Sequence, residues 1–189
     1  MTPTSCDLDS EKRQAALKAM EFVHDGMVVG LGTGTTSKHL ILALGERVRA
    51  GLNIQAVPTS HDTAALAKQS GIPLIESDNA WMIDVAIDGA DQVDPALNLV
   101  KGGGGALLKE KIVAAAAKRF IVMVDHTKLV PALGGSFPLP IEVVPFGWGS
   151  TARHIEAVSG GRAILRQRNG NVFQTEAGHV ILDLHMPNI

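Results

Sequence analysis

The stretch MVVGLGTGTT at residues 27–36 decides the fold, because it joins a short apolar strand to a helix through a glycine-rich turn. A buried strand is predicted over Met27–Leu31, and a helix from Thr36 to about Arg49. Glycines let the backbone approach an anion, and the start of a helix offers free N–H groups and a positive dipole. The turn is therefore a candidate phosphate site. A tight turn capped by threonine hydroxyls is the alternative.

The same order of strand and helix repeats over the first 130 residues. Further strands are predicted at 54–57, 72–75, 82–88 and 120–124, and further helices at 10–24, 60–70 and 106–118. Ser10 is the expected N-cap of the first helix. Strands that alternate with helices indicate an α/β fold with a doubly wound, Rossmann-like parallel sheet, which binds its ligands at the carboxyl ends of the strands.

A change of composition at Pro131 predicts a domain boundary, since residues 131–140 hold three prolines and two adjacent glycines. We expect a Rossmann-like catalytic domain at residues 1–130 and a small α+β domain at residues 131–189. The small domain is predicted from strands at 139–144, 163–167 and 180–184, a helix at 149–159 and a turn at Asn169-Gly170.

Composition excludes several classes of protein. With 46% hydrophobic and 19% charged residues, the chain has the apolar content to fold around a core. It carries 17 basic and 19 acidic residues, a net charge of −2, and no block of five like charges. Neither a nucleic-acid nor a membrane partner is therefore expected. The single cysteine, Cys6, favours a reduced, cytoplasmic protein.

Two acidic residues follow the strand predicted at 82–88, in the motif DGAD formed by Asp88, Gly89, Ala90 and Asp91. At the carboxyl end of a buried strand, their carboxylates are candidates for contacts to sugar hydroxyls and for proton transfer. The alternative is a turn whose aspartates accept hydrogen bonds from its own backbone, and the motif taken alone favours that alternative.

A third motif, KGGGG at residues 101–105, precedes the helix predicted at 106–118. Four consecutive glycines lose much chain entropy on ordering, which indicates that a ligand requires close approach of this backbone. Lys101 is suited to stabilise a developing oxyanion, and Glu110 on the following helix is a candidate general base. For Glu110 alone, a place on a solvated helix face is the commoner outcome.

The last motif, DHTK at residues 125–128, follows the strand predicted at 120–124 and makes Lys128 a candidate second phosphate contact. The seven histidines show no metal-ligand spacing such as HExxH, so no metal is expected. The sequence also lacks the GxSxG motif of a serine hydrolase.

These four motifs, in this order, resemble the ribose-5-phosphate isomerase A family. The resemblance covers nearly the whole chain and includes VPTS at 57–60 and FPLPIEVVPFGW at 137–148. It implies an aldose–ketose isomerase that interconverts D-ribose 5-phosphate and D-ribulose 5-phosphate in the non-oxidative pentose phosphate pathway, without metal or cofactor. It also implies a homo-oligomer, either a dimer or a tetramer.

Matched position by position, the resemblance assigns substrate binding to three loops and proton transfer to the helix after them. The loops contain Thr33, Gly34, Thr35 and Thr36; Asp88, Gly89, Ala90 and Asp91; and Lys101, Gly102, Gly103 and Gly104, with Lys128 as a further contact. Glu110 matches the family's proton acceptor. By this resemblance Asp88, Asp91 and Lys101 assist ring opening, and Glu110 moves a proton between carbon 2 and carbon 1 through a cis-enediolate.

The chain departs from the family pattern at three places. Thr35 stands where serine is common and keeps the hydroxyl, and Gln92 stands where an acidic residue is common. Family members usually continue for some tens of residues past the strand predicted at 180–184. We therefore expect a small domain that is shorter than theirs.

Two other functions fit parts of the sequence. A sugar-phosphate sensor that binds without turnover would lack the base and carry a DNA-binding module, whereas Lys101 and Glu110 are both present here. A nucleotide-dependent dehydrogenase would have glycine or alanine at position 35 and an acidic residue after the second strand, where Pro58-Thr59-Ser60 stands. The isomerase is the favoured hypothesis.

Overall fold

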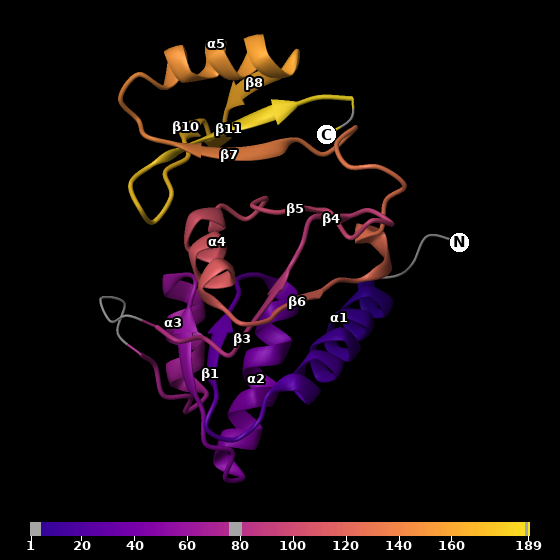
Figure 1. Ribbon diagram of the computed structural model, residues 1–189, viewed down its shortest axis with the longest axis vertical. Helices are drawn as coiled ribbons and strands as arrows, with labels where there is room; N and C mark the ends of the chain where they lie inside the picture. The colour runs from indigo at the N-terminus through magenta and orange to yellow at the C-terminus, as the bar shows by residue number, and fades with distance from the viewer. Residues whose placement is uncertain (1–4, 76–80, 188) are drawn as a thin grey trace. The chain divides into compact units, whose positions relative to one another are not determined.

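A computed structural model describes residues 5–75, 81–187 and 189 (Figure 1). The chain forms two compact units, one of Met1–Gly89 with Leu108–Thr127 and one of Ala90–Leu107 with Lys128–Ile189. The sequence predicted one boundary, after residue 130. The segment 90–107 groups with the C-terminal residues because Gln92 and Val93 hydrogen-bond to the backbone of Gly134 and Val130.

The first unit is built on a four-stranded parallel sheet of order β2-β1-β3-β6. Its strands are β1 (Val28–Leu31), β2 (Gln55–Pro58), β3 (Val85–Gly89) and β6 (Phe120–Met123). Its helices are α1 (Ser5–Ala19), α2 (Thr35–Arg49), α3 (His61–Gln69) and α4, which runs over Leu107–Ala116. The predicted Rossmann-like α/β fold is confirmed.

Side chains of the parallel sheet alternate between two apolar clusters, as the two-residue period of a strand requires. Val29 and Leu31 of β1 pack into a core shared with α1, α2 and α3. Ala86 of β3 and Val57 of β2 instead pack with Val113 of α4. The sheet is therefore covered by helices on both faces, with α4 on the face opposite to α1 and α2.

Gly30 sets how closely α4 approaches the sheet. A Cβ at this position would lie 2.5 Å from Cγ1 of Val113 and 3.0 Å from Cβ of Ala86. Because real Cβ atoms do not come so close to neighbours, any larger residue would push α4 away from β1. A glycine on the central strand thus allows the helix that carries Glu110 to pack closely against the sheet.

The second unit contains an antiparallel sheet of order β7-β11-β8, with α5 (Trp148–Ser159) beside β8 (Figure 1). Its strands are β7 (Leu139–Val143), β8 (Arg162–Leu165) and β11 (Val180–His185). Two short hairpins complete it, β4 (Gln92–Val93) with β5 (Leu99–Val100) and β9 (Gln167–Arg168) with β10 (Asn171–Val172). The turn predicted at Asn169-Gly170 joins β9 to β10, and both residues have positive φ.

Two expectations from the sequence differ from the structure, and one hairpin has no counterpart among them. The segment 72–75 forms one isolated bridge, between Leu74 and Ala56, and no strand. Ser10 lies inside α1, which begins at Ser5, and a short 3₁₀ helix at Met20–Phe22 follows it. The hairpin of β4 and β5 was not predicted, because its strands have two residues each and leave no periodic pattern.

An ion pair ties α1 to the loop after β6. Nδ1 of His126 lies 2.7 Å from Oε2 of Glu11, and the same carboxylate accepts the backbone N–H of His126 at 3.1 Å. The hydrogen bonds from His126 lower the pKa of Glu11, and the hydrogen bond to Glu11 raises the pKa of His126. Both shifts show that the contact stabilises the charged forms of the two side chains.

The Glu11–His126 pair predicts a pH window for stability. Because the pKa of His126 is raised, its pairing stabilises the folded protein fully below the ordinary histidine pKa of 6.5. This stabilisation is lost as the pH rises through the raised pKa. Because the pKa of Glu11 is lowered, its pairing stabilises the folded protein above the ordinary glutamate pKa of 4.5. This stabilisation is lost as the pH falls through the lowered pKa. The Tm deficit of Glu11→Gln is therefore expected to be larger at about pH 5.5 than at about pH 8.5.

Thermal melts at the two pH values test this window, with Glu21→Gln as the control. Glu21 is exposed, and its partner is Lys18 and not a histidine, the side chain whose charge ordinarily changes between about pH 5 and 8. The control deficit should not change between the two pH values. Equal deficits for Glu11→Gln at both would contradict the prediction.

Gly30→Ala is expected to lower the free energy of unfolding by about 1–3 kcal/mol, because the added methyl overpacks the contact with Val113. Urea denaturation measures this loss. Gly149→Ala is the matched control: Gly149 lies in α5, and a Cβ there meets no atom within 4 Å. That control should be neutral or slightly stabilising, since alanine favours a helix. An unchanged midpoint for Gly30→Ala would show that α4 adjusts without loss.

Candidate functional site

The order of the parallel sheet reverses at β1 and β3, which are neighbours. The chain leaves β1 into the turn 32–34 and α2, and it leaves β3 through Gly89. In open α/β sheets the ligand crevice lies at this reversal, outside the carboxyl ends of the strands. Two of the sequence motifs, GTGTT and DGAD, therefore meet where this fold binds its ligands.

Asp88 holds the glycine-rich turn against β3. Its carboxylate is 4% exposed, and Oδ1 accepts the backbone N–H groups of Thr33 at 3.2 Å and Gly89 at 2.7 Å. A Cβ at Gly32 would lie 1.9 Å from the same oxygen, so only glycine fits beside it. Asp88 thus does accept hydrogen bonds from its own turn, as the structural alternative expected, and it also fixes the turn of the neighbouring strand.

The four residues of the first loop surround the start of α2. Gly34 is the N-cap with a φ of 125°, which favours glycine, and the helix begins at Thr35. The backbone N–H groups of the first helical turn have no acceptor within a helix, so they are suited to an anion. Gly34 and Thr35 are exposed, whereas Thr33 and Thr36 are half-buried.

A cluster of hydroxyl groups anchors Thr33 to the loop between β2 and α3. Oγ1 of Thr33 lies 2.8 Å from Oγ1 of Thr59, 2.8 Å from Oγ of Ser60 and 3.2 Å from Oγ1 of Thr63. Thr63 in turn donates to the carbonyl of Gly32 at 3.0 Å. Thr63 carried no signal in the sequence, because its role depends on contacts with Thr33 and Gly32, which lie 30 and 31 residues earlier.

Glu110 is buried on α4, three residues before Val113, whose side chain contacts Gly30. Its residue is 7% exposed, while the neighbouring Lys111 is exposed. The solvated-face alternative is therefore wrong for Glu110. Burial distinguishes Glu110 from the solvated position that is usual for a glutamate on a helix.

In the second unit, Asp91 precedes β4 and Lys101 follows β5, at the open end of their hairpin. The strands pair Gln92 with Val100, so the next positions along them are Asp91 and Lys101. The backbone N–H of Asp91 donates to the carbonyl of Val100 at 2.8 Å. A carboxylate and an ammonium-bearing residue thus stand at the open end of one hairpin.

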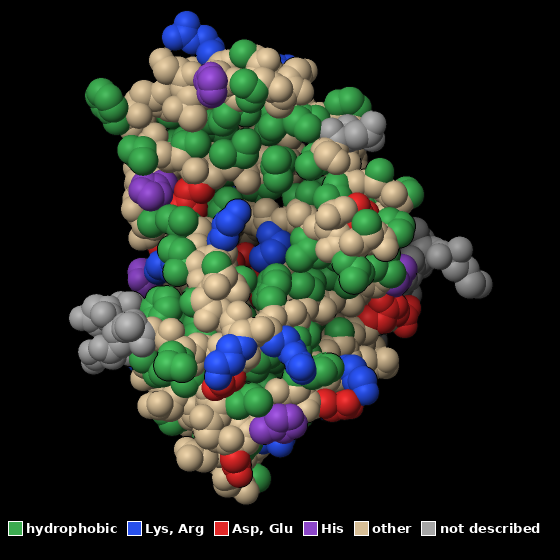
Figure 2. All heavy atoms as spheres, viewed as in Figure 1, with side chains coloured by type: hydrophobic (Ala, Val, Ile, Leu, Met, Phe, Trp, Pro, Cys, Tyr) green, Lys and Arg blue, Asp and Glu red, His purple; other side chains and the backbone are tan. Residues whose placement is uncertain are grey.

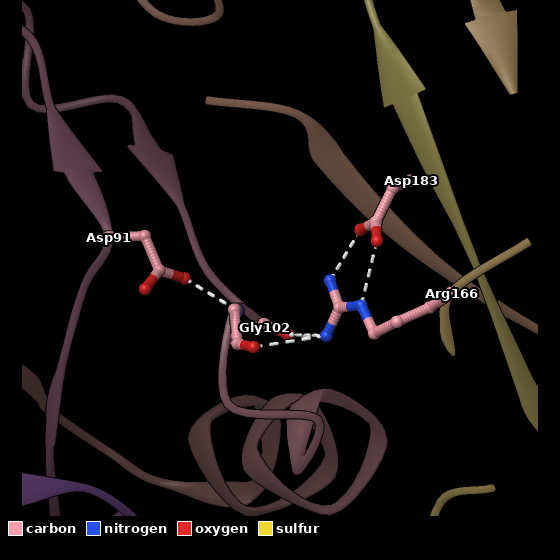
Figure 3. A network of polar contacts seen from close by, with 5 residues as sticks. Asp91, Gly102, Arg166 and Asp183 are labelled. Carbon is pink, nitrogen blue, oxygen red and sulfur yellow. Dashed lines mark hydrogen bonds and ion pairs between the residues drawn. The ribbon is translucent and has the colours of Figure 1, made fainter. Parts of the chain in front are cut away.

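Asp91 also holds the third loop, since its Oδ2 accepts the backbone N–H of Gly103 at 2.8 Å (Figure 3). A Cβ at Gly103 would lie 2.7 Å from Oδ1 of Asp91, and Gly102 has a φ of 101°. Gly103 is thus required by the protein's own carboxylate, and Gly102 by its backbone conformation.

The predicted site residues divide between the two units. The first unit contains Thr33, Gly34, Thr35, Thr36, Asp88, Gly89 and Glu110, and the second contains Ala90, Asp91, Lys101, Gly102, Gly103, Gly104 and Lys128. The structure brings Thr33 to Asp88 and Gly103 to Asp91. Lys128 ends a short 3₁₀ helix at His126–Lys128, after the buried Asp125, whose carboxylate accepts the N–H of Thr127.

Gln92, the departure after DGAD, has a structural partner. Its amide donates to the carbonyl of Gly134 at 3.1 Å and accepts the N–H of Gly134 at 2.8 Å. An amide matches both backbone groups at once, whereas an ionised carboxylate only accepts. Glutamine at position 92 therefore stabilises the contact between β4 and the proline-rich segment 131–140.

On the face shown in Figure 2, basic side chains stand among acidic and hydrophobic ones. Within residues 5–75, 81–187 and 189, no three histidine, cysteine or acidic side chains group so that they could hold a metal ion. In the same part of the chain, no helix is long and apolar enough to cross a membrane.

Comparison with known proteins gives the chain a family. The family model for ribose 5-phosphate isomerase A (phosphoriboisomerase A) matches residues 55–189. The ribose-5-phosphate isomerase A of Bradyrhizobium diazoefficiens is 53% identical over 193 residues, which cover 97% of this chain and 80% of that protein.

Solved structures agree with the sequence match. A D-ribose-5-phosphate isomerase in complex with phospho-erythronic acid is 42% identical, with a TM-score of 0.90 over 96% of this chain and 81% of that one. The ribose 5-phosphate isomerase from Plasmodium falciparum is 35% identical, with a TM-score of 0.90 over 95% of this chain and 80% of that one. With the family model, the relatives and the fold in agreement, the chain belongs to the ribose 5-phosphate isomerase A family.

Proposed function

We propose that Glu110, Lys101, Asp88 and Asp91 carry the chemistry of this chain. The activity is that of its family: the chain is an aldose–ketose isomerase that interconverts D-ribose 5-phosphate and D-ribulose 5-phosphate. The assignment of the base rests on one observation above all, the burial of Glu110 on a helix seated against the central strand. A carboxylate held in that way has a fixed position for proton transfer.

In the proposed reaction the carboxylate of Glu110 takes the proton from carbon 2 of the open-chain aldose. The electron pair of the C–H bond forms a double bond between carbons 1 and 2, and negative charge collects on oxygen 1. Glu110 then returns its proton to carbon 1, while a proton passes from oxygen 2 to oxygen 1. The product is the ketose, and the carboxylate is restored without any oxidant or reductant.

Charge and orientation in this scheme come from the loops. The ammonium of Lys101 counters the negative charge of the cis-enediolate, an interaction that is stronger in the transition state than with the neutral sugar. Asp88 and Asp91 accept hydrogen bonds from sugar hydroxyls and assist ring opening. Both carboxylates are already anchored to backbone N–H groups, which supports a fixed orientation for their remaining lone pairs.

The phosphate is proposed to bind the first loop. The N–H groups at the start of α2, the exposed backbone at Gly34 and Thr35, and the anchored hydroxyl of Thr33 supply donors of the kind that phosphate accepts. Lys128 is a further proposed contact, together with the backbone of Gly89, Ala90, Gly102 and Gly104. Its ammonium adds a positive charge that an anionic substrate favours.

We also propose a cytoplasmic homo-oligomer, a dimer or a tetramer. Exposed apolar side chains support assembly, because Val144, Phe146 and Val158 of the second unit are 59%, 95% and 72% exposed. The single cysteine and the metabolic family favour the cytoplasm.

Glu110→Gln is expected to lower kcat at least about a hundredfold, because the amide cannot accept the proton from carbon 2. Affinity for the sugar phosphate should stay nearly unchanged, since the side chain keeps its size. Isomerisation assays measure kcat, and titration with phospho-erythronic acid measures binding. Glu46→Gln, an exposed glutamate on α2, is the matched control and should keep full activity. An active Glu110→Gln would remove Glu110 from the role of base.

Thr33→Val keeps the shape of the side chain but removes the hydroxyl that joins the Thr59, Ser60 and Thr63 cluster. The KM for ribose 5-phosphate is expected to rise about tenfold, because one hydrogen bond to a charged group contributes at least about 1.5 kcal/mol to binding. Thr33→Ser retains the hydroxyl and should keep KM within about twofold. Steady-state kinetics distinguish the two variants, with Thr151→Val on the exposed surface of α5 as a control. An unchanged KM in Thr33→Val would refute this use of the hydroxyl.

A further inference from the structure

A second ion pair, far from the motifs in sequence, reaches the glycine-rich loop. Arg166 follows β8, and its Nε donates to Oδ2 of Asp183 on β11 at 2.8 Å, while Nη2 pairs with Oδ1 of the same carboxylate (Figure 3). The two side chains are 13% and 16% exposed. The remaining nitrogen, Nη1, donates to the carbonyl oxygens of Gly102 at 3.1 Å and Gly103 at 3.0 Å.

One peptide group of the loop is therefore held from both sides. In a trans peptide the carbonyl and the next N–H point in opposite directions. The carbonyl of Gly102 accepts from Arg166, and the N–H of Gly103, in the same peptide, donates to Asp91 at 2.8 Å. By the same geometry, the bond from Arg166 to the carbonyl of Gly103 directs the N–H of Gly104 away from the guanidinium. Arg166 and Asp91 together fix the orientation of two successive peptides.

The loop depends on such bonds because glycine has no side chain with which to anchor itself. Gly102 and Gly105 have φ values of 101° and 93°, in the region that L side chains rarely adopt. The ring of Phe173 lies where a Cβ of Gly105 would be, with its Cζ 2.5 Å from that position. The glycines of the loop are thus held through backbone hydrogen bonds and close packing.

We propose that Arg166 is a positioning residue of the isomerase: with Asp183, it fixes the glycine-rich loop and so the side chain of Lys101 at its start. This inference rests on the proposed role of Lys101. Arginine suits the task because its planar fork makes the paired bonds to the carboxylate and still donates to two carbonyls. Lysine has one nitrogen and cannot reach both partners. Asp183 keeps the guanidinium in place and balances its charge.

Arg166→Met is expected to lower kcat about 10- to 100-fold, because a loop displaced by about 1 Å misplaces the group that stabilises the enediolate. KM should change by a smaller factor than kcat, since the first loop with its phosphate contacts is untouched and the glycine-rich loop adds only backbone contacts to binding. Arg166→Lys keeps the charge but not the fork, so it should restore less than about a third of the lost kcat. Full recovery with lysine would show that charge alone matters and would overturn the positioning role.

The matched control is Glu142→Gln on β7. Glu142 forms an ion pair with His179 at 3.1 Å and accepts a hydrogen bond from Thr175 at 2.8 Å in the same small sheet. Its loss should lower the Tm but leave kcat within about twofold, because the loop bonds remain. If Glu142→Gln lowers kcat as much as Arg166→Met for an equal loss of Tm, the effect is general destabilisation and the inference fails.

A double-mutant cycle with Lys101→Met tests the route of the effect. If Arg166 acts through Lys101, Arg166→Met should change kcat/KM less than about threefold in the Lys101→Met background. Additive losses would overturn the inference and leave the role of Lys101 intact. Full activity of Lys101→Met would instead refute the proposed function and the inference with it. Should Arg166→Met fail to fold, Arg166→Lys takes its place in the cycle, with the same outcomes deciding.

Discussion

The buried carboxylate of Asp88 is the interaction on which the first unit's site depends. At the point where the strand order reverses, one oxygen accepts the N–H of Thr33 from β1's turn and of Gly89 from its own strand. The contact exists only because position 32 is glycine, where a Cβ would lie 1.9 Å from that oxygen. A carboxylate, a glycine and a strand end therefore fix where α2 begins, and with it the anion-binding end of that helix.

The two aspartates of the DGAD motif, Asp88 and Asp91, each accept a backbone hydrogen bond from a different glycine-rich loop. Asp88 accepts an N–H of the first glycine-rich loop, and Asp91 accepts an N–H of the third. The structural and the chemical explanations of the motif are thus compatible, because a carboxylate oxygen has lone pairs for a backbone donor and for a sugar hydroxyl. Anchoring a carboxylate in this way fixes its direction before substrate arrives, which reduces the reorganisation that catalysis requires.

Features coded by neighbours in the sequence could be predicted, and features coded by distant contacts could not. The strand, turn and helix of 27–49 follow from local spacing, as do the turn at Asn169-Gly170 and the small α+β sheet. Glu110 lies on the helix that packs against Gly30, 80 residues earlier, through Val113. The helical periodicity of the sequence does not predict its burial. Arg166 lies 64 positions from Gly102, and nothing in the residues around it distinguishes it from a surface arginine. The two-residue strands β4 and β5 are too short to leave a pattern, although they pair Gln92 with Val100 and so bring the flanking Asp91 and Lys101 to one end of the hairpin.

The glycine-rich loop shows why Lys101, the lysine proposed to act in catalysis, would depend on residues so far away. Ordering four glycines costs about 4–8 kcal/mol in backbone entropy at about 1–2 kcal/mol each. Three hydrogen bonds to charged groups, two from Arg166 and one to Asp91, stabilise it by about 5–9 kcal/mol at about 1.5–3 kcal/mol each. The two quantities are of similar size, so loss of the two bonds from Arg166 would loosen the position of the loop. Glycine provides the close approach of the backbone, and the ion pair of Arg166 and Asp183 provides the rigidity that glycine lacks.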